Sequence, residues 1–287
     1  MPDLISENLR EDLLNVFEDP TYAPPMLPAV ALEVLALTTR AEPDLKKIVS
    51  LLERDQMMAL YVLRLASSAL YAGRARIRTL HEAVLRLGAN VVRDAVFEVA
   101  LRKGMLSRGE YGRTVATIAR HSTLTAYITR IVCRHARIDN SLAFLSGLLH
   151  DVGFAALLLA VEHVEGPGAP KVAALWPHVD ALHERASRLL ARRWMLPDEL
   201  VEIVGYHHHL HTSKFSPVAA AVQIADHLTE YVGGSVVGPG PSGEPIPGDL
   251  VGEFDLEANA AALGIDDTGL ARIRAEAERT VPEIALL

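Results

Sequence analysis

Histidines and aspartates that interrupt apolar helical sequence are the residues of this chain most able to do chemistry. His150 and Asp151 stand side by side at the end of one apolar run, and Asp226 interrupts another. His121 lies among core-like residues of a long predicted helix. A half-buried imidazole or carboxylate is costly when it has no partner. A divalent metal ion would offset that cost for several of these groups at once.

Three further histidines could join such a site. His183 lies in a helix predicted over residues 171–194, and His207 and His208 are adjacent near the end of the next helix. Neighbouring side chains point about 100° apart around a helix axis, so this pair could serve two metal ions, or one could ligate while the other forms a hydrogen bond. Each residue alone also fits a structural role, as a satisfied histidine or a solvated or capping aspartate. The spacing does not decide between these alternatives.

Helices must position these residues, because the sequence predicts an all-α fold. No segment alternates apolar and polar residues as a strand would, and no internal repeat is visible. Thr79 and Glu82 form a capping box that opens one helix, which Gly88 then breaks. The other predicted helices cover residues 1–19, 29–41, 56–70, 91–101, 114–134, 141–151, 154–163, 171–194, 198–209, 216–231 and 267–280, with a further one after Pro43.

Composition and charge narrow the classes of function. The 287 residues have a formal net charge of −8, which gives no global attraction to nucleic acid or acidic membranes. The lone Cys133 sits in an apolar helical stretch, so we expect a buried, inert thiol. His150 and Asp151 separate the apolar stretches Phe144–Leu149 and Phe154–Val161, and each stretch is shorter than the roughly 20 residues that span a bilayer. No signal peptide is recognisable, and we expect a soluble cytoplasmic protein.

The order of the motifs, a histidine, a His-Asp pair and a later aspartate, resembles the HD superfamily of metal-dependent phosphohydrolases. The finer pattern resembles its HDOD family, mostly bacterial signalling proteins. The matching segments are Leu27–Val30, Leu51–Asp55, Leu63–Tyr71, Leu80–Gly88, Leu148–Gly153, His183–Glu184, Trp194–Pro197 and Ile203–His208. The resemblance implies a multi-helical HD-like bundle. Its expected parts are an N-terminal helix and linker (residues 1–22), an N-terminal helical lobe (residues 23–108) and a metal-binding lobe (residues 109–287) with a mobile Gly/Pro-rich loop (residues 233–248).

The chain also resembles the HD-GYP phosphodiesterases of cyclic di-GMP at the positions that bind a two-metal centre in that family. These positions are His121, His150, Asp151, His183, His207, His208 and Asp226. The resemblance implies two divalent metal ions, and ligands without thiolate favour Fe, Mn, Zn or Mg. Asp151 would bridge the two ions and is the expected catalytic residue of a phosphohydrolase acting on a phosphoester or nucleotide.

Departures from the HD-GYP pattern argue against hydrolysis of cyclic di-GMP. Phe154 stands where the motif His-Asp-x-Gly-Lys has its lysine, which removes a cation that could contact phosphate. The Gly-Tyr-Pro loop after the paired histidines is absent, and Thr117 replaces a carboxylate that sometimes supports a third metal. Several cations near site residues in sequence could serve a phosphate group or be ordinary surface charge. They are Arg120, Arg185, Arg188 and Lys214.

A non-enzymatic role is the alternative, because many HDOD members lack the metal ligands and resemble regulatory or scaffold modules. In that case the metal is structural or redox-sensing, or the site is vestigial and its polar groups bond to one another. The loops over residues 74–78 and 233–248 would suit protein contacts or be plain solvated loops. We expect the partner to be a signalling protein or a phosphorylated small molecule, and neither a nucleic acid nor a membrane. The sequence leaves the oligomeric state open.

Overall fold

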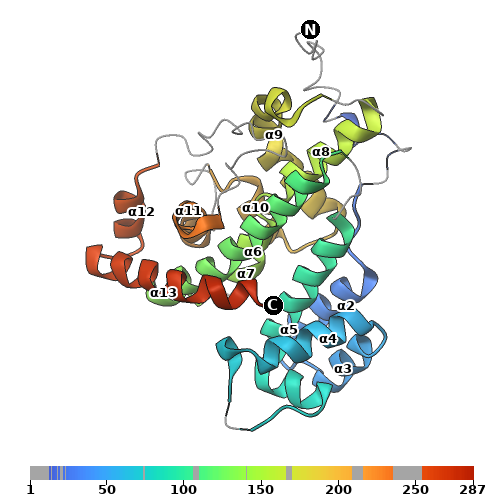
Figure 1. Ribbon diagram of the computed structural model, residues 1–287, viewed down its shortest axis with the longest axis vertical. Helices are drawn as coiled ribbons and strands as arrows, with labels where there is room; N and C mark the ends of the chain where they lie inside the picture. Colours follow the sequence, from blue (N-terminus) through green and yellow to red (C-terminus); the bar gives the residue numbers. More distant parts are fainter. Residues whose placement is uncertain are drawn as a thin grey trace. The chain divides into compact units, whose positions relative to one another are not determined.

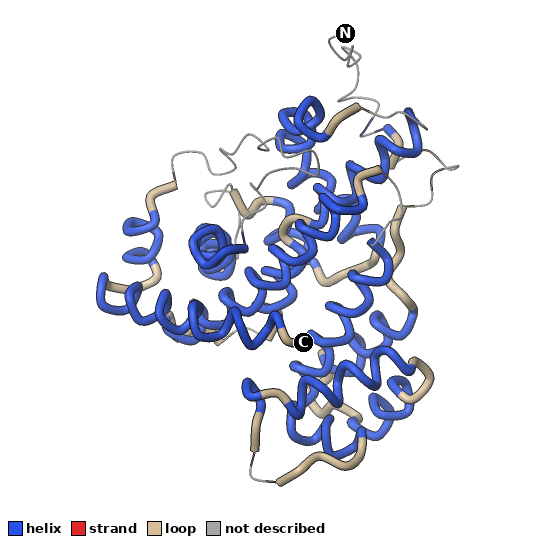
Figure 2. Tube along the Cα trace, viewed as in Figure 1, coloured by secondary structure: helices blue, strands red, loops and turns tan. Residues whose placement is uncertain are grey.

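The computed structural model describes Leu13, Tyr22 and residues 15–17, 19, 24–73, 75–105, 110–139, 141–165, 170–208, 216–234 and 254–287, and the findings below concern these residues. Their regular structure is helical, with no strand, so the predicted all-α fold is confirmed (Figures 1 and 2). The chain divides into two compact units. The small unit contains Leu27–Gly104 and Glu278–Leu287, and the large unit contains Met1–Met26 and Met105–Ala277.

Polar residues at helix starts shape the small unit. The carboxylates of Asp44 and Asp55 accept hydrogen bonds from backbone N–H groups in the first turns of α3 and α4. Half of the predicted capping box is present, since Thr79 Oγ1 accepts from the N–H of Glu82 at 3.1 Å. The Glu82 carboxylate accepts from the N–H of Arg78, one residue before the cap, at 2.7 Å. Gly88 has a φ of +76° and kinks the helix it interrupts. The elements are α2 (Ala29–Thr38), α3 (Leu45–Leu52), α4 (Gln56–Ser67), η1 (Ala69–Tyr71) and α5 (Leu80–Met105).

The large unit holds every residue predicted to ligate a metal. Its elements are α6 (Gly112–His135), α7 (Ala143–Leu149), α8 (Val152–Glu165), α9 (Val172–Arg193), α10 (Asp198–Gly205), α11 (Ser216–Thr229), η3 (Glu230–Gly234), α12 (Leu256–Ala262) and α13 (Asp267–Ala285), whose last residues belong to the small unit. The sequence analysis missed α12, a seven-residue helix capped by Asp255. It also extended α10 to residue 209, whereas His207 and His208 lie beyond its end.

Apolar faces of distant helices form the core of the large unit. Ile128 and Val132 of α6 pack with Ile224 of α11 and Ile273 of α13. Cys133 lies in the same cluster, so the predicted burial of its thiol is confirmed. Burial raises the pKa of this thiol to about 12, and the nucleophilic thiolate is therefore scarce near neutral pH.

One apolar stretch is longer than the sequence analysis allowed. Residues Ala143–Val164 together are long and apolar enough to cross a membrane by length and composition, because His150 and Asp151 do not lower the mean hydropathy enough to divide the stretch. However, 94% of the most apolar window is buried inside the protein. The stretch forms α7 and α8, and its burial is that of core helices.

Some predictions concern residues that lie outside the described ranges. They are most of the helix over residues 1–19, the turn over residues 166–169, Arg74, Lys214 and the part of the Gly/Pro-rich loop beyond Gly234.

Candidate metal centre

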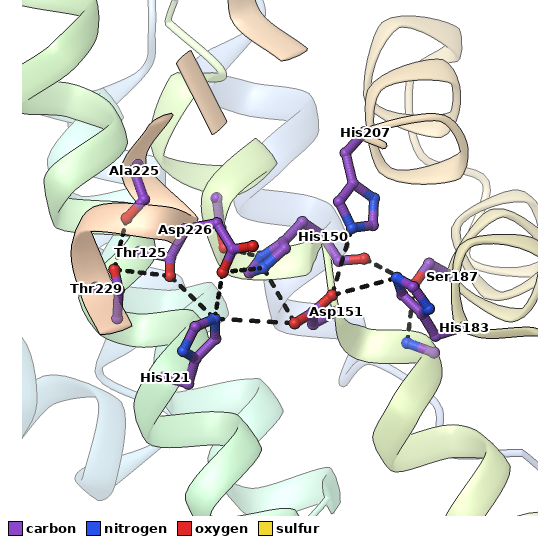
Figure 3. Close-up of polar contacts among 12 residues, drawn as sticks. His121, Thr125, His150, Asp151, His183, Ser187, His207, Ala225, Asp226 and Thr229 are labelled. Atoms are coloured by element: carbon purple, nitrogen blue, oxygen red, sulfur yellow. Dashed lines mark hydrogen bonds and ion pairs between the residues drawn. The ribbon is translucent and has the colours of Figure 1, made fainter. Parts of the chain in front are cut away.

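The large unit brings together seven side chains from five separate segments of the sequence, and six of them are labelled in Figure 3. His121 comes from the middle of α6, and His150 and Asp151 form the junction between α7 and α8. The other members are His183 in α9, His207 and His208 just after α10, and Asp226 in α11. These are the seven residues that the sequence singled out, and the structure brings them together in one cluster, in which His208 is half-buried and the others are buried.

Asp151 lies at the centre of this cluster and faces it with both carboxylate oxygens. Its Oδ2 is 3.1 Å from His150 Nε2 and 3.8 Å from His121 Nε2. Its Oδ1 is 3.4 Å from His207 Nε2 and 3.7 Å from His183 Nε2. Because the two oxygens face different histidines, Asp151 belongs to two groups of ligand atoms at the same time.

The first group contains two imidazoles and two carboxylates, from His121, His150, Asp151 and Asp226. His121 Nε2 lies 2.7 Å from Asp226 Oδ1, and His150 Nε2 lies 3.5 Å from the same oxygen. The Thr125 hydroxyl lies 3.4 Å from His121 Nε2 and donates to Thr229 Oγ1 at 3.0 Å. This contact ties α6 to α11, the two helices that carry His121 and Asp226.

The second group contains three imidazoles and one carboxylate, from His183, His207, His208 and Asp151. In each group the candidate ligand atoms all lie within 4.8 Å of one another. The sequence left open whether the paired histidines would diverge, and the structure places both in this second group. Glu184 supports the pair, because its carboxylate accepts a hydrogen bond from the backbone N–H of His208 at 2.7 Å.

Three of the histidines each form the same kind of hydrogen bond with the backbone. The Nδ1 atoms of His150, His183 and His207 face the carbonyl oxygens three residues earlier in the chain, at 2.8, 2.5 and 3.1 Å respectively. A carbonyl only accepts, so each Nδ1 must carry the hydrogen. In a neutral imidazole of this tautomer the Nε2 lone pair is free to bind a metal, and such contacts orient metal-ligating histidines in proteins.

The same three histidines leave buried nitrogen atoms without a hydrogen bond. The Nε2 atoms of His150, His183 and His207 are shielded from solvent, and none has a hydrogen-bond partner among the described residues. The shortest of their distances to the carboxylate joins His150 Nε2 and Asp151 Oδ2, at 3.1 Å. Buried polar atoms are rarely left in this state. All three point at the Asp151 carboxylate, and a cation beside that carboxylate would satisfy them.

Burial and neighbouring charges shift the pKa values of the two ligand groups in different ways. Burial would raise the pKa values of Asp151 and Asp226, but the facing imidazoles outweigh it and hold both well below the ordinary range. Burial would lower the pKa of His150, but Asp151 and Asp226 outweigh it and raise that pKa. In the second group burial prevails and lowers the pKa of His183 to about 4. The His183 ring is therefore neutral near pH 7 and can offer its Nε2 to a metal without first losing a proton.

Close packing against α9 holds the junction that carries His150 and Asp151. Ser187 Oγ donates to the carbonyl oxygen of His150 at 2.8 Å and accepts from the N–H of Gly153 at 2.9 Å. A Cβ atom on Gly153 would lie 2.0 Å from the carbonyl oxygen of His183, so only glycine permits this approach. The junction therefore has a fixed position relative to His183.

Of the cations considered for a phosphate, Arg188 has other partners and two more are exposed. Arg188 stacks over Tyr206, with its Cζ 4.6 Å from the ring centroid, and pairs with Glu202 at 3.2 Å. Arg120 and Arg185 are exposed. Thr117 is also exposed, and its hydroxyl donates to the carbonyl oxygen one turn earlier in α6.

Three residues have supporting roles that the sequence did not reveal, although Glu184 stands in one of the matching segments named above. Ser187 and Glu184 hold the backbone at His150 and His208, and Glu230 lies 4.0 Å from His121 Nδ1. Their sequence positions give little sign of these roles, because each contact joins segments that only the tertiary fold brings together.

The fold and the converging side chains together are those of the HD-like superfamily. Within it, a family model for the HDOD domain matches residues 25–210, which is more than half of the chain, and the protein belongs to the HDOD domain family. The expected family is therefore confirmed. A crystal structure from Shewanella amazonensis SB2B has the same fold, with a TM-score of 0.71, 19% identity and 96% of each chain covered. The name of that protein assigns it provisionally to the metal-dependent phosphohydrolases.

Two curated relatives are longer than this chain. An uncharacterised protein of Treponema pallidum is 22% identical over 250 residues, which cover 82% of this chain and 46% of the relative. A ribonuclease Y from Desulfotalea psychrophila is 31% identical over 160 residues, which cover 55% of this chain and 25% of the relative. The chain thus spans less than half the length of these relatives.

Proposed function

We propose that this HDOD protein holds two divalent metal ions in the cluster around Asp151 and hydrolyses a phosphoester. One observation carries the proposal: both oxygens of a buried carboxylate face separate groups of ligand atoms, and three buried imidazole nitrogens beside it lack hydrogen bonds. Imidazole and carboxylate ligands without thiolate suit Fe, Mn, Zn or Mg. The names of two relatives, a ribonuclease and a provisional metal-dependent phosphohydrolase, support the choice of a phosphoester.

Each candidate ligand has an assigned role in the proposed centre. His121, His150 and Asp226 would hold one ion, His183, His207 and His208 the other, and Asp151 would bridge the two. When bound, such ions supply Lewis-acid stabilisation of a phosphoryl group and lower the pKa of a water molecule. The backbone carbonyls behind His150, His183 and His207 keep the ligating nitrogens aimed inward. Phe154 offers no cation to the substrate, so the metal ions would have to balance most of the negative charge of the phosphate.

Metal content tests the first half of the proposal. Protein purified without a chelator should contain about two equivalents of divalent metal by elemental mass spectrometry. Asp151→Asn should retain well under one equivalent, because it removes the charge shared by both groups. Asp198→Asn, at an exposed position of the same unit, should leave the content unchanged. Less than about half an equivalent in the wild-type protein would contradict the proposed centre.

Hydrolysis tests the second half. The metal-loaded protein should cleave a generic phosphodiester such as bis(p-nitrophenyl) phosphate, or a member of a panel of nucleotides and short RNA oligonucleotides. Asp151→Asn should reduce the rate by at least about a hundredfold, the size expected when metal-ion catalysis is lost. Equal rates for the wild type and Asp151→Asn would rule out the phosphohydrolase. Two bound metals without turnover would favour the non-enzymatic signalling module.

A further inference from the structure

An aromatic side chain lies directly against one of the candidate ligands. Phe154 is 2% exposed and follows the His150–Asp151 junction by one helical turn. Its ring stacks on the imidazole of His183, with centroids 4.2 Å apart and planes 10° from parallel. The same ring also stacks on Trp176, with centroids 5.0 Å apart and planes 5° from parallel. Phe154 of α8 therefore forms a nearly parallel three-ring stack with two residues of α9 that are seven positions apart in the sequence.

This stack and one hydrogen bond together determine how the His183 ring lies. The Nδ1 atom is 2.5 Å from the carbonyl oxygen of Asp180, which determines which edge of the ring faces its own helix. That bond alone permits the ring to tilt about the Nδ1···O direction. The face of Phe154 restricts the tilt, and it leaves Nε2 3.7 Å from Asp151 Oδ1. A flexible lysine at this position would not present such a flat surface.

We propose that Phe154 is a positioning residue for the second ligand group. It fixes the imidazole plane of His183 so that His183 Nε2 points to where an ion bound by Asp151 Oδ1 would lie. The inference rests on the proposed two-metal centre and adds a specific role for the residue that replaces the lysine. Phe154 offers no ligand atom of its own, and its effect would pass through His183. Groups that orient a metal ligand commonly change metal affinity by about 10- to 100-fold.

Metal titration of matched variants tests this role. Metal-free protein is titrated with Co²⁺, and binding is followed by equilibrium dialysis and by visible d–d absorption. The wild type should bind two ions. Phe154→Met should bind the first ion normally and the second at least about tenfold more weakly. Phe154→Tyr, which keeps the ring face, should restore the second binding event. His183→Ala identifies that event, because it removes a ligand of the second group only.

Phe144→Met is the matched control, since Phe144 is equally buried and stacks on no histidine that faces Asp151. It should lose similar stability and keep both ions. No Co²⁺ uptake by the wild type would overturn both this inference and the proposed function. Two ions bound with unchanged affinity by Phe154→Met would overturn this inference alone. Equal weakening in Phe154→Tyr or Phe144→Met would do the same, because the effect would then not depend on the ring stack.

Discussion

At the scale of single residues, backbone carbonyls determine which ring nitrogen of three histidines faces the cluster. His150, His183 and His207 each have Nδ1 close to the carbonyl oxygen three residues earlier. The sequence identified these histidines as candidates, but it could not show this arrangement, because every residue has a carbonyl group. A carbonyl inside a helix can accept a second hydrogen bond, and whether the ring turns toward it depends on the packing around the ring, which follows from the tertiary fold.

The tautomer of His183 is a direct prediction. In metal-free protein at pH 7 its ring should be neutral with the proton on Nδ1, because burial lowers its pKa to about 4 and Asp180 accepts from Nδ1. Two-dimensional ¹H–¹⁵N NMR of the imidazole nitrogens measures this, and His183→Gln assigns the signal. Exposed His81 serves as the control and should show no locked Nδ1–H. A His183 ring that carries its proton on Nε2 at pH 7 would contradict the structure.

The lowered pKa of His183 also predicts how the free energy of unfolding changes with pH. The unfolded chain binds a proton at His183 near pH 6.5, whereas the folded protein binds it only near pH 4. The unfolded state therefore takes up more protons between these values, and metal-free protein should lose stability as the pH falls through this window.

At the scale of elements, the junction between α7 and α8 explains how the site is held. The sequence predicted helices on both sides of His150 and Asp151, and the junction is where they meet. It did not predict that Gly153 and Ser187 clamp the junction to α9, because that contact joins residues 34 positions apart. The short helix α12 was missed for a related reason. Its seven residues are too few to show a periodic apolar face.

Gly153→Ala tests the clamp. The new Cβ would lie 2.0 Å from the carbonyl oxygen of His183, so α8 and α9 must separate. We expect a loss of about 2–3 kcal/mol in the free energy of unfolding, measured by urea denaturation, as for other overpacked cores. The variant should also bind metal less tightly through the second group. Gly269→Ala in α13 is the control, because the nearest atoms to its Cβ are side-chain atoms at 3.0 and 3.2 Å, which can shift. Equal stability of the two variants would argue against the clamp.

At the scale of the whole molecule, the chain divides its tasks between two units. All seven candidate ligands belong to the large unit, and none belongs to the small unit. The all-α class and the seven-residue set followed from the sequence because apolar periodicity and the order of His and Asp motifs are local features. The inclusion of the C-terminal residues Glu278–Leu287 in the small unit could not be anticipated, because it depends on contacts such as that of Arg64 with the carbonyl oxygen of Leu286.

Metal removal should therefore affect the two units unequally. A ligand that binds only the folded state stabilises the part of the protein that forms its site. Chelation should speed amide hydrogen exchange in α6, α8, α9 and α11, measured by mass spectrometry, and leave α3 and α4 unchanged. Asp151→Asn is the control and should show no response to the chelator. A uniform change over both units would show that they open as one cooperative body.

The placement of the two Asp151 oxygens has a consequence for the free energies with which two metal ions would bind. In the proposed centre, an ion bound to one oxygen would restrain the carboxylate and withdraw charge from the other oxygen, so the two binding free energies would be coupled through a single side chain. Such coupling is reciprocal. Whatever factor the first ion imposes on the affinity of the second, the second imposes on the first, and the centre would respond to metal concentration as a linked pair.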